Sequence, residues 1–152
     1  MKVVGTEYNL NHKALEVYLS GCKAPHCQGC HNEELWDFNV GYDAFGSING
    51  SIIKKITNPM VKRVWIMGGE PLDQNPKQLL LFMATLEHFS GDRELEYWIW
   101  TRYTELPEKL WWKFTHAKIG PYMKNLPSYI DEGYGITLAS SNQRIIKLDK
   151  QI

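Results

Sequence analysis

Residues 61–89 read VKRVWIMGGEPLDQNPKQLLLFMATLEHF, and the expected fold class follows from this stretch. Residues 61–67 are mostly apolar and rich in strand formers, which predicts a buried strand that ends at two glycines. Asn75 and Pro76 then predict the N-cap and the first residue of a helix of about 14 residues, which extends through Phe89. A buried strand followed by a helix is typical of a parallel sheet with crossover helices.

Upstream of this stretch, the chain repeats the pattern of strand and helix. Residues 14–20 (ALEVYLS) alternate and predict a first strand. Residues 51–57 (SIIKKIT) space their isoleucines as a helix does, with Asn49 or Ser51 as the expected cap.

Downstream, the pattern continues and then becomes weaker. Residues 95–101 (LEYWIWT) predict a third strand, and Pro107 opens a short helix. Residues 117–119 predict a short fourth strand, and the last 30 residues predict an irregular wrap that ends in strand-like residues 144–148. We therefore expect an α/β fold with a mainly parallel sheet.

Length and composition indicate an ordinary folded protein. The 152 residues suffice for one domain with a buried core, so we expect residues 1–152 to form a single domain. The 17 basic and 17 acidic residues balance, so we expect neither nucleic acid nor a membrane as a partner. Residues 1–7 lack the apolar core of a signal peptide, which predicts a cytoplasmic protein with reduced thiols.

All three cysteines of the chain, Cys22, Cys27 and Cys30, follow the predicted strand at residues 14–20. An odd number of cysteines without a secretion signal argues against disulfides. Soft sulfur ligands select iron–sulfur clusters, zinc or copper, and a tight loop lets several thiolates converge on one cluster. Three cysteines leave one iron of a four-iron cluster without a protein ligand, and a reaction can take place at that open iron.

Three other kinds of site fit parts of the same loop. Structural zinc needs His26 or His31 as a fourth ligand, although zinc sites usually draw ligand pairs from separated segments. Residues 27–31 (CQGCH) match the pattern of c-type haem attachment, which belongs outside the cytoplasm. Cys27 and Cys30 also match a thioredoxin-like redox pair, which leaves Cys22 unexplained. The pattern favours an iron–sulfur cluster over each of them.

Gly68, Gly69 and Glu70 follow the strand at residues 61–67. Ligands of parallel sheets lie beyond the carboxyl ends of the strands, so we expect these residues and the cysteines at the same edge. Two glycines allow a close approach of the backbone to a ligand, and their N–H groups can form a small nest. Glu70 offers an acceptor for an amine. The same residues also fit a simple turn.

Together, the cysteines and residues 67–71 (MGGEP) resemble the motifs of radical S-adenosylmethionine (SAM) enzymes. The flanking residues are similar, more narrowly, to the activating component of anaerobic ribonucleotide reductase. These flanking matches are residues 21–22, 27–32, 36, 100–101, 120–122 and 140–144.

The resemblance implies a partial (β/α) barrel with one [4Fe-4S] cluster on the three cysteines and SAM chelating the open iron. Residues 68–70 match the family's element that meets the amino group of SAM. In the family, an electron from a reduced flavodoxin or ferredoxin cleaves SAM to methionine and a 5′-deoxyadenosyl radical. That radical takes a hydrogen atom from a glycine of the large reductase subunit and leaves a glycyl radical. The resemblance therefore predicts an activase whose partner is the large subunit of an anaerobic ribonucleotide reductase.

Three further residues are candidates for contact with SAM. His31 and Asn32 follow the last cysteine and reach either the bound cofactor or solvent. Thr101 stands at the carboxyl end of its predicted strand, where ligands of parallel sheets bind.

Two aromatic residues and the C-terminal segment carry weaker expectations. Trp111 and Trp112 occupy adjacent helical positions that point about 100° apart, so we expect at least one to be exposed and to join a protein interface. Residues 142–144 (NQR) are expected to cap the site or to contact the reductase.

The chain departs from the family pattern in two places. The usual spacing is C-x3-C-x2-C, whereas this chain has one more residue between Cys22 and Cys27, and we expect it to bulge outward at Ala24 and Pro25. Residues 9–13 (NLNHK) replace the glycine-rich, arginine-bearing segment often found before the first strand. Two other functions remain open: a small-molecule radical SAM enzyme similar to 7-carboxy-7-deazaguanine synthase, and a zinc-stabilised binding module.

Overall fold

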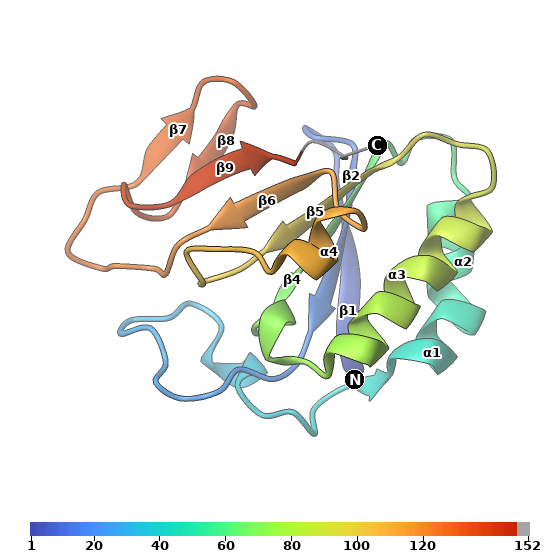
Figure 1. Ribbon diagram of the computed structural model, residues 1–152, viewed down its shortest axis with the longest axis horizontal. Helices are drawn as coiled ribbons and strands as arrows, with labels where there is room; N and C mark the ends of the chain where they lie inside the picture. Colours follow the sequence, from blue (N-terminus) through green and yellow to red (C-terminus); the bar gives the residue numbers. More distant parts are fainter. Residues whose placement is uncertain (149–152) are drawn as a thin grey trace.

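In residues 1–148, which the computed structural model describes, seven strands form one sheet (Figure 1). These strands are β1 (Lys2–Asn9), β2 (Ala14–Leu19), β3 (Tyr42–Asp43), β4 (Arg63–Gly68), β5 (Glu96–Trp100), β6 (His116–Ile119) and β9 (Arg144–Lys147). They lie in the order β3-β1-β2-β4-β5-β6-β9. A hairpin of β7 (Tyr129–Asp131) and β8 (Ile136–Leu138) forms a second, small sheet.

The four central strands of the large sheet are parallel. β2 pairs with β4, β4 with β5, and β5 with β6, all in parallel register. The outer strands β1, β3 and β9 pair antiparallel. The predicted α/β class with a mainly parallel central sheet is therefore confirmed, and the carboxyl ends of β2, β4, β5 and β6 meet at one edge.

Helix α3 (Pro76–Ser90) connects β4 to β5 and begins where the sequence predicts. The side-chain oxygen of Asn75 accepts hydrogen bonds from the N–H groups of Lys77 at 3.0 Å and Gln78 at 3.2 Å. The helix ends one residue beyond the predicted end, and Gly91 follows it with a φ of 64°. Within residues 1–148, no helix is long and apolar enough to cross a membrane.

The helical segment before β4 begins earlier than predicted. It comprises α1 (Ala44–Ser47), the π-helical turn η2 (Ile48–Ile52) and α2 (Ile53–Ile56). Oδ1 of Asp43 caps its first turn, since it accepts hydrogen bonds from the N–H groups of Phe45 and Gly46, both at 3.0 Å. The predicted start at residue 51, capped by Asn49 or Ser51, is therefore wrong.

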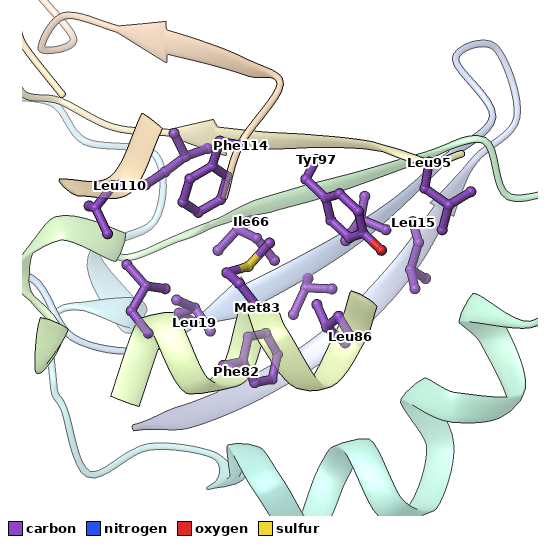
Figure 2. Close-up of a cluster of buried hydrophobic side chains, with 14 of the residues drawn as sticks. Leu15, Leu19, Ile66, Phe82, Met83, Leu86, Leu95, Tyr97, Leu110 and Phe114 are labelled. Carbon is purple, nitrogen blue, oxygen red and sulfur yellow. The ribbon is translucent and has the colours of Figure 1, made fainter. Parts of the chain in front are cut away.

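Each face of the sheet has its own core. Figure 1 shows α1, α2 and α3 together on one side of the sheet. Figure 2 shows the core on that side, where Ile66 of β4 packs near Phe82 and Met83 of α3. On the other face, Trp65 and Trp98 pack in one cluster with residues of the β7–β8 hairpin. Trp65 and Trp98 are therefore core residues.

Four strands lie where no strand was predicted. β1 and β3 precede β4, and β7 and β8 lie in the segment that was expected to be irregular. Val3 is the one buried residue of β1, and β7 buries none. β1, β3 and β7 bury few side chains, so their sequences lack the alternation that would reveal them. β8 buries Ile136 and Leu138, but it has only three residues.

The short helix α4 (Glu108–Trp111) bears out the expectation for the two adjacent tryptophans. Trp111 is partly buried, and its indole N–H donates to the carbonyl of Leu106 at 2.8 Å. Trp112 is 58% exposed. An interface role for Trp112 stays a prediction.

Candidate functional site

The loops after the four parallel strands line one pocket at the carboxyl edge of the sheet. The residues predicted to bind a metal or cofactor all line it: Cys22, Cys27, Cys30, His31, Asn32, Gly68, Gly69, Glu70 and Thr101. The topology thus brings together two motifs that are separated in the sequence, as expected for a parallel sheet. Which of these residues bind a ligand stays a prediction.

The cysteine loop, residues 22–30, presents its thiols at partial exposure. Cys22, Cys27 and Cys30 are all free. The N–H of Cys22 donates to the carbonyl of Trp36 at 3.1 Å, which anchors the start of the loop. The N–H of Asn32 approaches Sγ of Cys30 at 3.4 Å. The loop therefore directs three unoxidised thiols toward one pocket.

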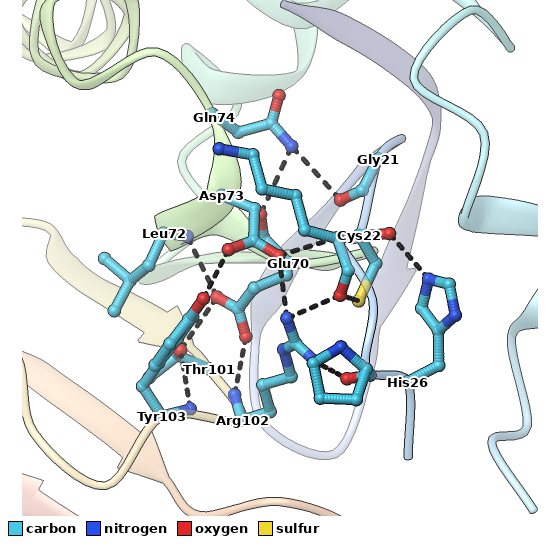
Figure 3. A network of polar contacts seen from close by, with 12 residues as sticks. Gly21, Cys22, His26, Glu70, Leu72, Asp73, Gln74, Thr101, Arg102 and Tyr103 are labelled. Carbon is cyan, nitrogen blue, oxygen red and sulfur yellow. Dashed lines mark hydrogen bonds and ion pairs between the residues drawn. The ribbon is translucent and has the colours of Figure 1, made fainter. Parts of the chain in front are cut away.

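Arg102 ties the additional residue of the loop to the edge of β5 (Figure 3). Its guanidinium donates to the carbonyl of Lys23 at 2.7 Å and to the carbonyl of Pro25. It also pairs with the carboxylate of Asp73 at 3.0 Å. That carboxylate accepts two further hydrogen bonds, from the N–H of Lys23 at 2.8 Å and the hydroxyl of Tyr103 at 2.5 Å. Residues outside the loop thus hold the additional residue in place.

His26 contacts the backbone at the start of the bulge that Ala24 and Pro25 form. Ala24 and Pro25 are exposed, as expected for a bulge that points outward. Nε2 of His26 lies 2.7 Å from the carbonyl oxygen of Cys22, and its ring stacks on Trp36 with centroids 3.8 Å apart. Because the backbone engages this nitrogen and the ring is stacked, His26 is poorly placed as a fourth zinc ligand.

Gly68 and Gly69 let the end of β4 contact the end of β2 through backbone atoms. Gly68 has a φ of 110°, and a Cβ atom on Gly69 would lie 2.5 Å from the carbonyl oxygen of Gly21. The N–H groups of Gly69 and Glu70 donate to the carbonyls of Leu19 and Gly21, both at 2.8 Å. The expected nest of free N–H groups is therefore wrong, because the end of β2 already accepts both hydrogen bonds.

Glu70 is a carboxylate, only 1% exposed, that joins the edges of β4 and β5. It accepts hydrogen bonds from the hydroxyl of Thr101 at 2.7 Å and from the N–H groups of Leu72 at 2.9 Å and Arg102 at 2.6 Å. Burial raises the pKa of Glu70, and these hydrogen bonds oppose the rise. A carboxylate has about four acceptor positions, so Glu70 can accept one more donor from the pocket.

The thiol of Cys22 lies in an environment that disfavours a free thiolate. Burial raises the pKa of Cys22 to about 11, and the guanidinium of Arg102 only partly opposes this rise. The acidic groups of Asp73 and Glu70 raise it further. Metal binding needs the thiolate form, and a bound metal ion supplies the positive charge that stabilises it. Iron provides that charge, and a set of three thiols suits an iron–sulfur cluster.

The side chains of residues 1–148 form no convergent ligand set for a single metal ion. In residues 1–148, no three side chains among His, Cys, Asp and Glu lie close enough to hold one ion. Zinc needs its ligands at about 2.0–2.3 Å from one centre, whereas each cysteine of a cubane binds a different iron. Three thiols that line one pocket are compatible with a cluster.

The two predicted residues that directly follow the cysteine loop lie at the exposed side of the pocket. His31 and Asn32 are both exposed and line the pocket. The ring of His31 lies 4.8 Å from the ring of Tyr122, measured between centroids. Both residues can therefore contact either solvent or a bound ligand.

The C-terminal segment 142–144 contacts the chain just after β6, where two of its side-chain amides donate to backbone carbonyls. The amide of Asn142 donates to the carbonyl of Pro121 at 2.8 Å, and that of Gln143 donates to the carbonyl of Gly120 at 3.2 Å. Gln143 also lines the pocket, whereas Arg144 is exposed on β9. The geometry therefore agrees with the capping alternative for Gln143.

Sequence reasoning missed two charged residues of the pocket, Arg102 and Lys118. Lys118 lies in the predicted strand at residues 117–119. Strand alternation alone places its side chain on the face of the sheet opposite to the side chains of Ala117 and Ile119. Arg102 directly follows a predicted strand, but no local pattern signals its contacts with the cysteine loop.

Fold and site together define an iron–sulfur protein. Residues 13–146 match the family described as a 4Fe-4S single cluster domain, and this match covers most of the chain. The chain therefore belongs to that family, which supports the predicted [4Fe-4S] cluster. None of the curated proteins compared with the chain matches it.

Proposed function

We propose that this chain is a radical SAM enzyme that activates an anaerobic ribonucleotide reductase. The observation that carries the proposal is that the three cysteines and residues 68–70 line one pocket at the carboxyl ends of the parallel strands. Membership of the 4Fe-4S single cluster family supports the cluster. The sequence resemblance supports SAM, the partial-barrel type of fold and the reductase as partner.

The residues of the pocket have distinct roles in this function. Cys22, Cys27 and Cys30 hold the cluster and leave one iron for SAM. When bound, the cluster supplies one electron, received from a flavodoxin or ferredoxin, for the reductive cleavage of SAM. Glu70 keeps an acceptor position for the amino group of SAM, and Trp100 lines the same pocket.

Anaerobic reconstitution with iron and sulfide tests this proposal. We expect about four irons and four sulfides per chain, and reductive conversion of SAM to methionine and 5′-deoxyadenosine. With the candidate reductase present, electron paramagnetic resonance should show the doublet of a glycyl radical. Cys22→Ala is the matched control, since it removes one ligand at the unusual spacing and should abolish stable cluster and SAM cleavage together.

Other outcomes of the same experiment identify the alternatives. Cleavage of SAM without the doublet would favour a radical SAM enzyme that acts on a small molecule. About one zinc per chain, with no iron or sulfide, would favour a zinc-stabilised binding module. A Cys22→Ala protein that still cleaves SAM would disprove the assignment of Cys22.

A further inference from the structure

A further cavity, of about 400 Å³, lies at the amino ends of β2, β4 and β5, at the edge of the sheet opposite to the cysteine pocket. Its volume is in the range of small-molecule sites. The turn between β1 and β2 and the starts of β4 and β5 supply its lining, which comprises Asn11, His12, Lys13, Lys62, Arg63, Glu94 and Glu96. The turn at residues 9–13, where the chain departs from the family pattern, therefore forms one wall of this amino-edge cavity.

Arg63 is held in place from two sides at this cavity. Its Nε donates to Oε2 of Glu96 at 2.6 Å, and its guanidinium lies over the ring of Trp98, 5.6 Å from the centroid. The same carboxylate oxygen accepts the indole N–H of Trp98 at 2.9 Å. In residues 1–148, the terminal nitrogens Nη1 and Nη2 of Arg63 have no hydrogen-bond partner. Arg63 therefore offers a positioned pair of donors, which is the arrangement that binds an oxyanion through two hydrogen bonds.

Lys13 has a backbone conformation that glycine adopts more easily. Its φ is 52°, and in residues 1–148 no other residue except glycine has a positive φ. Lysine in the left-handed region costs free energy that glycine would avoid. The carbonyl of Lys13 accepts the N–H groups of Lys62 at 2.9 Å and Arg63 at 3.1 Å, which joins the turn to the start of β4. Lysine at this position thus adds a charge to the cavity that glycine could not supply.

Positive charge predominates in the lining. Lys13, Lys62 and Arg63 contribute three cations, whereas Glu94 and Glu96 contribute two carboxylates. One of these carboxylates, Glu96, is already paired with Arg63. The charges that remain for a ligand are therefore mainly positive, so the cavity favours an anion.

Asn11 and His12 add uncharged polar groups to the same cavity. Burial lowers the pKa of His12, and the charge of Arg63 lowers it further, against the opposing charge of Glu16. The imidazole is therefore mainly neutral at neutral pH, and it can both donate and accept a hydrogen bond. Its ring packs near Trp65, with centroids 5.4 Å apart.

We propose that the amino-edge cavity binds a phosphate ester, a small molecule in which a phosphate group is attached to a body that carries hydroxyl groups. The guanidinium of Arg63 and the ammonium groups of Lys13 and Lys62 bind the phosphate. Asn11 and His12 bind the hydroxyl groups. A phosphate monoester carries nearly two negative charges at neutral pH, so it matches three cations better than a monocarboxylate does.

Calorimetric titration of the cluster-loaded protein, under anaerobic conditions and at low salt, tests this site with ribose 5-phosphate, inorganic phosphate and ribose as probes. We expect ribose 5-phosphate to bind more tightly than inorganic phosphate and ribose not to bind. Arg63→Lys keeps the charge but loses the paired donors, and Lys13→Gly removes one cation and the unfavourable φ. Each should weaken the binding of ribose 5-phosphate about 10-fold.

Lys54→Gln is the matched control, since Lys54 is an exposed lysine of α2 that is absent from the cavity lining. It should leave every affinity unchanged. If Arg63→Lys does not fold, Lys62→Gln removes an exposed cation of the same cavity and should also weaken binding.

Three results would overturn the proposal. Absence of binding of both phosphate probes would remove the site. Equal losses in Lys54→Gln and in the cavity variants would show that only the general charge of the surface attracts the anion. Equal affinities for ribose 5-phosphate and inorganic phosphate would show that the cavity does not recognise an ester.

Discussion

At the scale of single residues, Arg102→Met should release the cysteine loop from the edge of β5. The guanidinium binds the carbonyls of Lys23 and Pro25 and pairs with Asp73, whose side chain is 3% exposed. Because the variant leaves a buried carboxylate without its cation, we expect the free energy of unfolding to fall by about 2–3 kcal/mol. Reconstituted protein should also retain less iron. Denaturant unfolding and iron analysis measure these effects.

Tyr103→Phe is the matched control for this residue. It removes one hydrogen bond to Asp73 and leaves both loop carbonyls bound to Arg102. We expect a loss of about 1 kcal/mol and an iron content near that of wild type. Equal iron content in Arg102→Met and wild type would show that the loop keeps its shape without the guanidinium.

At the scale of elements, β6 and the β7–β8 hairpin meet at His116, which should make stability depend on pH. The buried ring of His116 stacks on Trp98 with centroids 4.4 Å apart, and the ring of Tyr134 packs edge-on at 5.3 Å. Burial lowers the pKa of His116 from 6.5, against the opposing charge of Glu96, and Arg63 adds to the lowering. Just below pH 6.5 the unfolded chain therefore binds a proton that the folded chain does not. The stability that depends on a neutral His116 is therefore fully present above the pKa that this side chain has in the unfolded chain. It is lost as the pH falls through the pKa that His116 has in the folded chain.

Urea unfolding of wild type and His116→Phe, from about pH 5 to about pH 8, measures this dependence. Phenylalanine keeps an aromatic ring beside Trp98 and cannot titrate. The difference in unfolding free energy between the two proteins should be constant above about pH 7 and should shift in favour of the variant at lower pH. A difference that does not change with pH would contradict the assignment.

The elements that sequence predicts well are those whose signals are local. Asn75 caps α3 within three residues, and β2, β4 and β5 are contiguous buried runs. β1 and β7 escape prediction because they bury little and depend on pairing with other strands, and β8 escapes it because its buried run is only three residues long. The cysteines and residues 68–70 are likewise predicted as contiguous motifs. Arg102 is not predicted, because it binds the carbonyl of Lys23, which lies 79 positions away in the sequence. Lys118 is not predicted either, because strand register places it in the pocket.

At the scale of the whole molecule, the same backbone contacts build the pocket and close the sheet, so stability and cluster binding should change together. The N–H groups of Gly69 and Glu70 bind the end of β2, directly before the cysteine loop. Gly69→Ala would place a Cβ atom 2.5 Å from the carbonyl oxygen of Gly21 and force the ends of β2 and β4 apart. We expect the free energy of unfolding to fall by about 2–3 kcal/mol and the iron content to fall with it.

Gly50→Ala is the matched control for this coupling, since a Cβ atom there would meet nothing within 4 Å in the helical turn η2. Alanine should stabilise that turn by about 0.5 kcal/mol and leave the iron content unchanged. Denaturant unfolding of the metal-free proteins and iron analysis of the reconstituted proteins measure the two quantities separately. If Gly69→Ala lost iron at wild-type stability, the glycine would act on the cofactor alone. If Gly69→Ala lost stability and still bound a full cluster, the pocket would not depend on the contact between β2 and β4. Either result would contradict the coupling between stability and cluster binding.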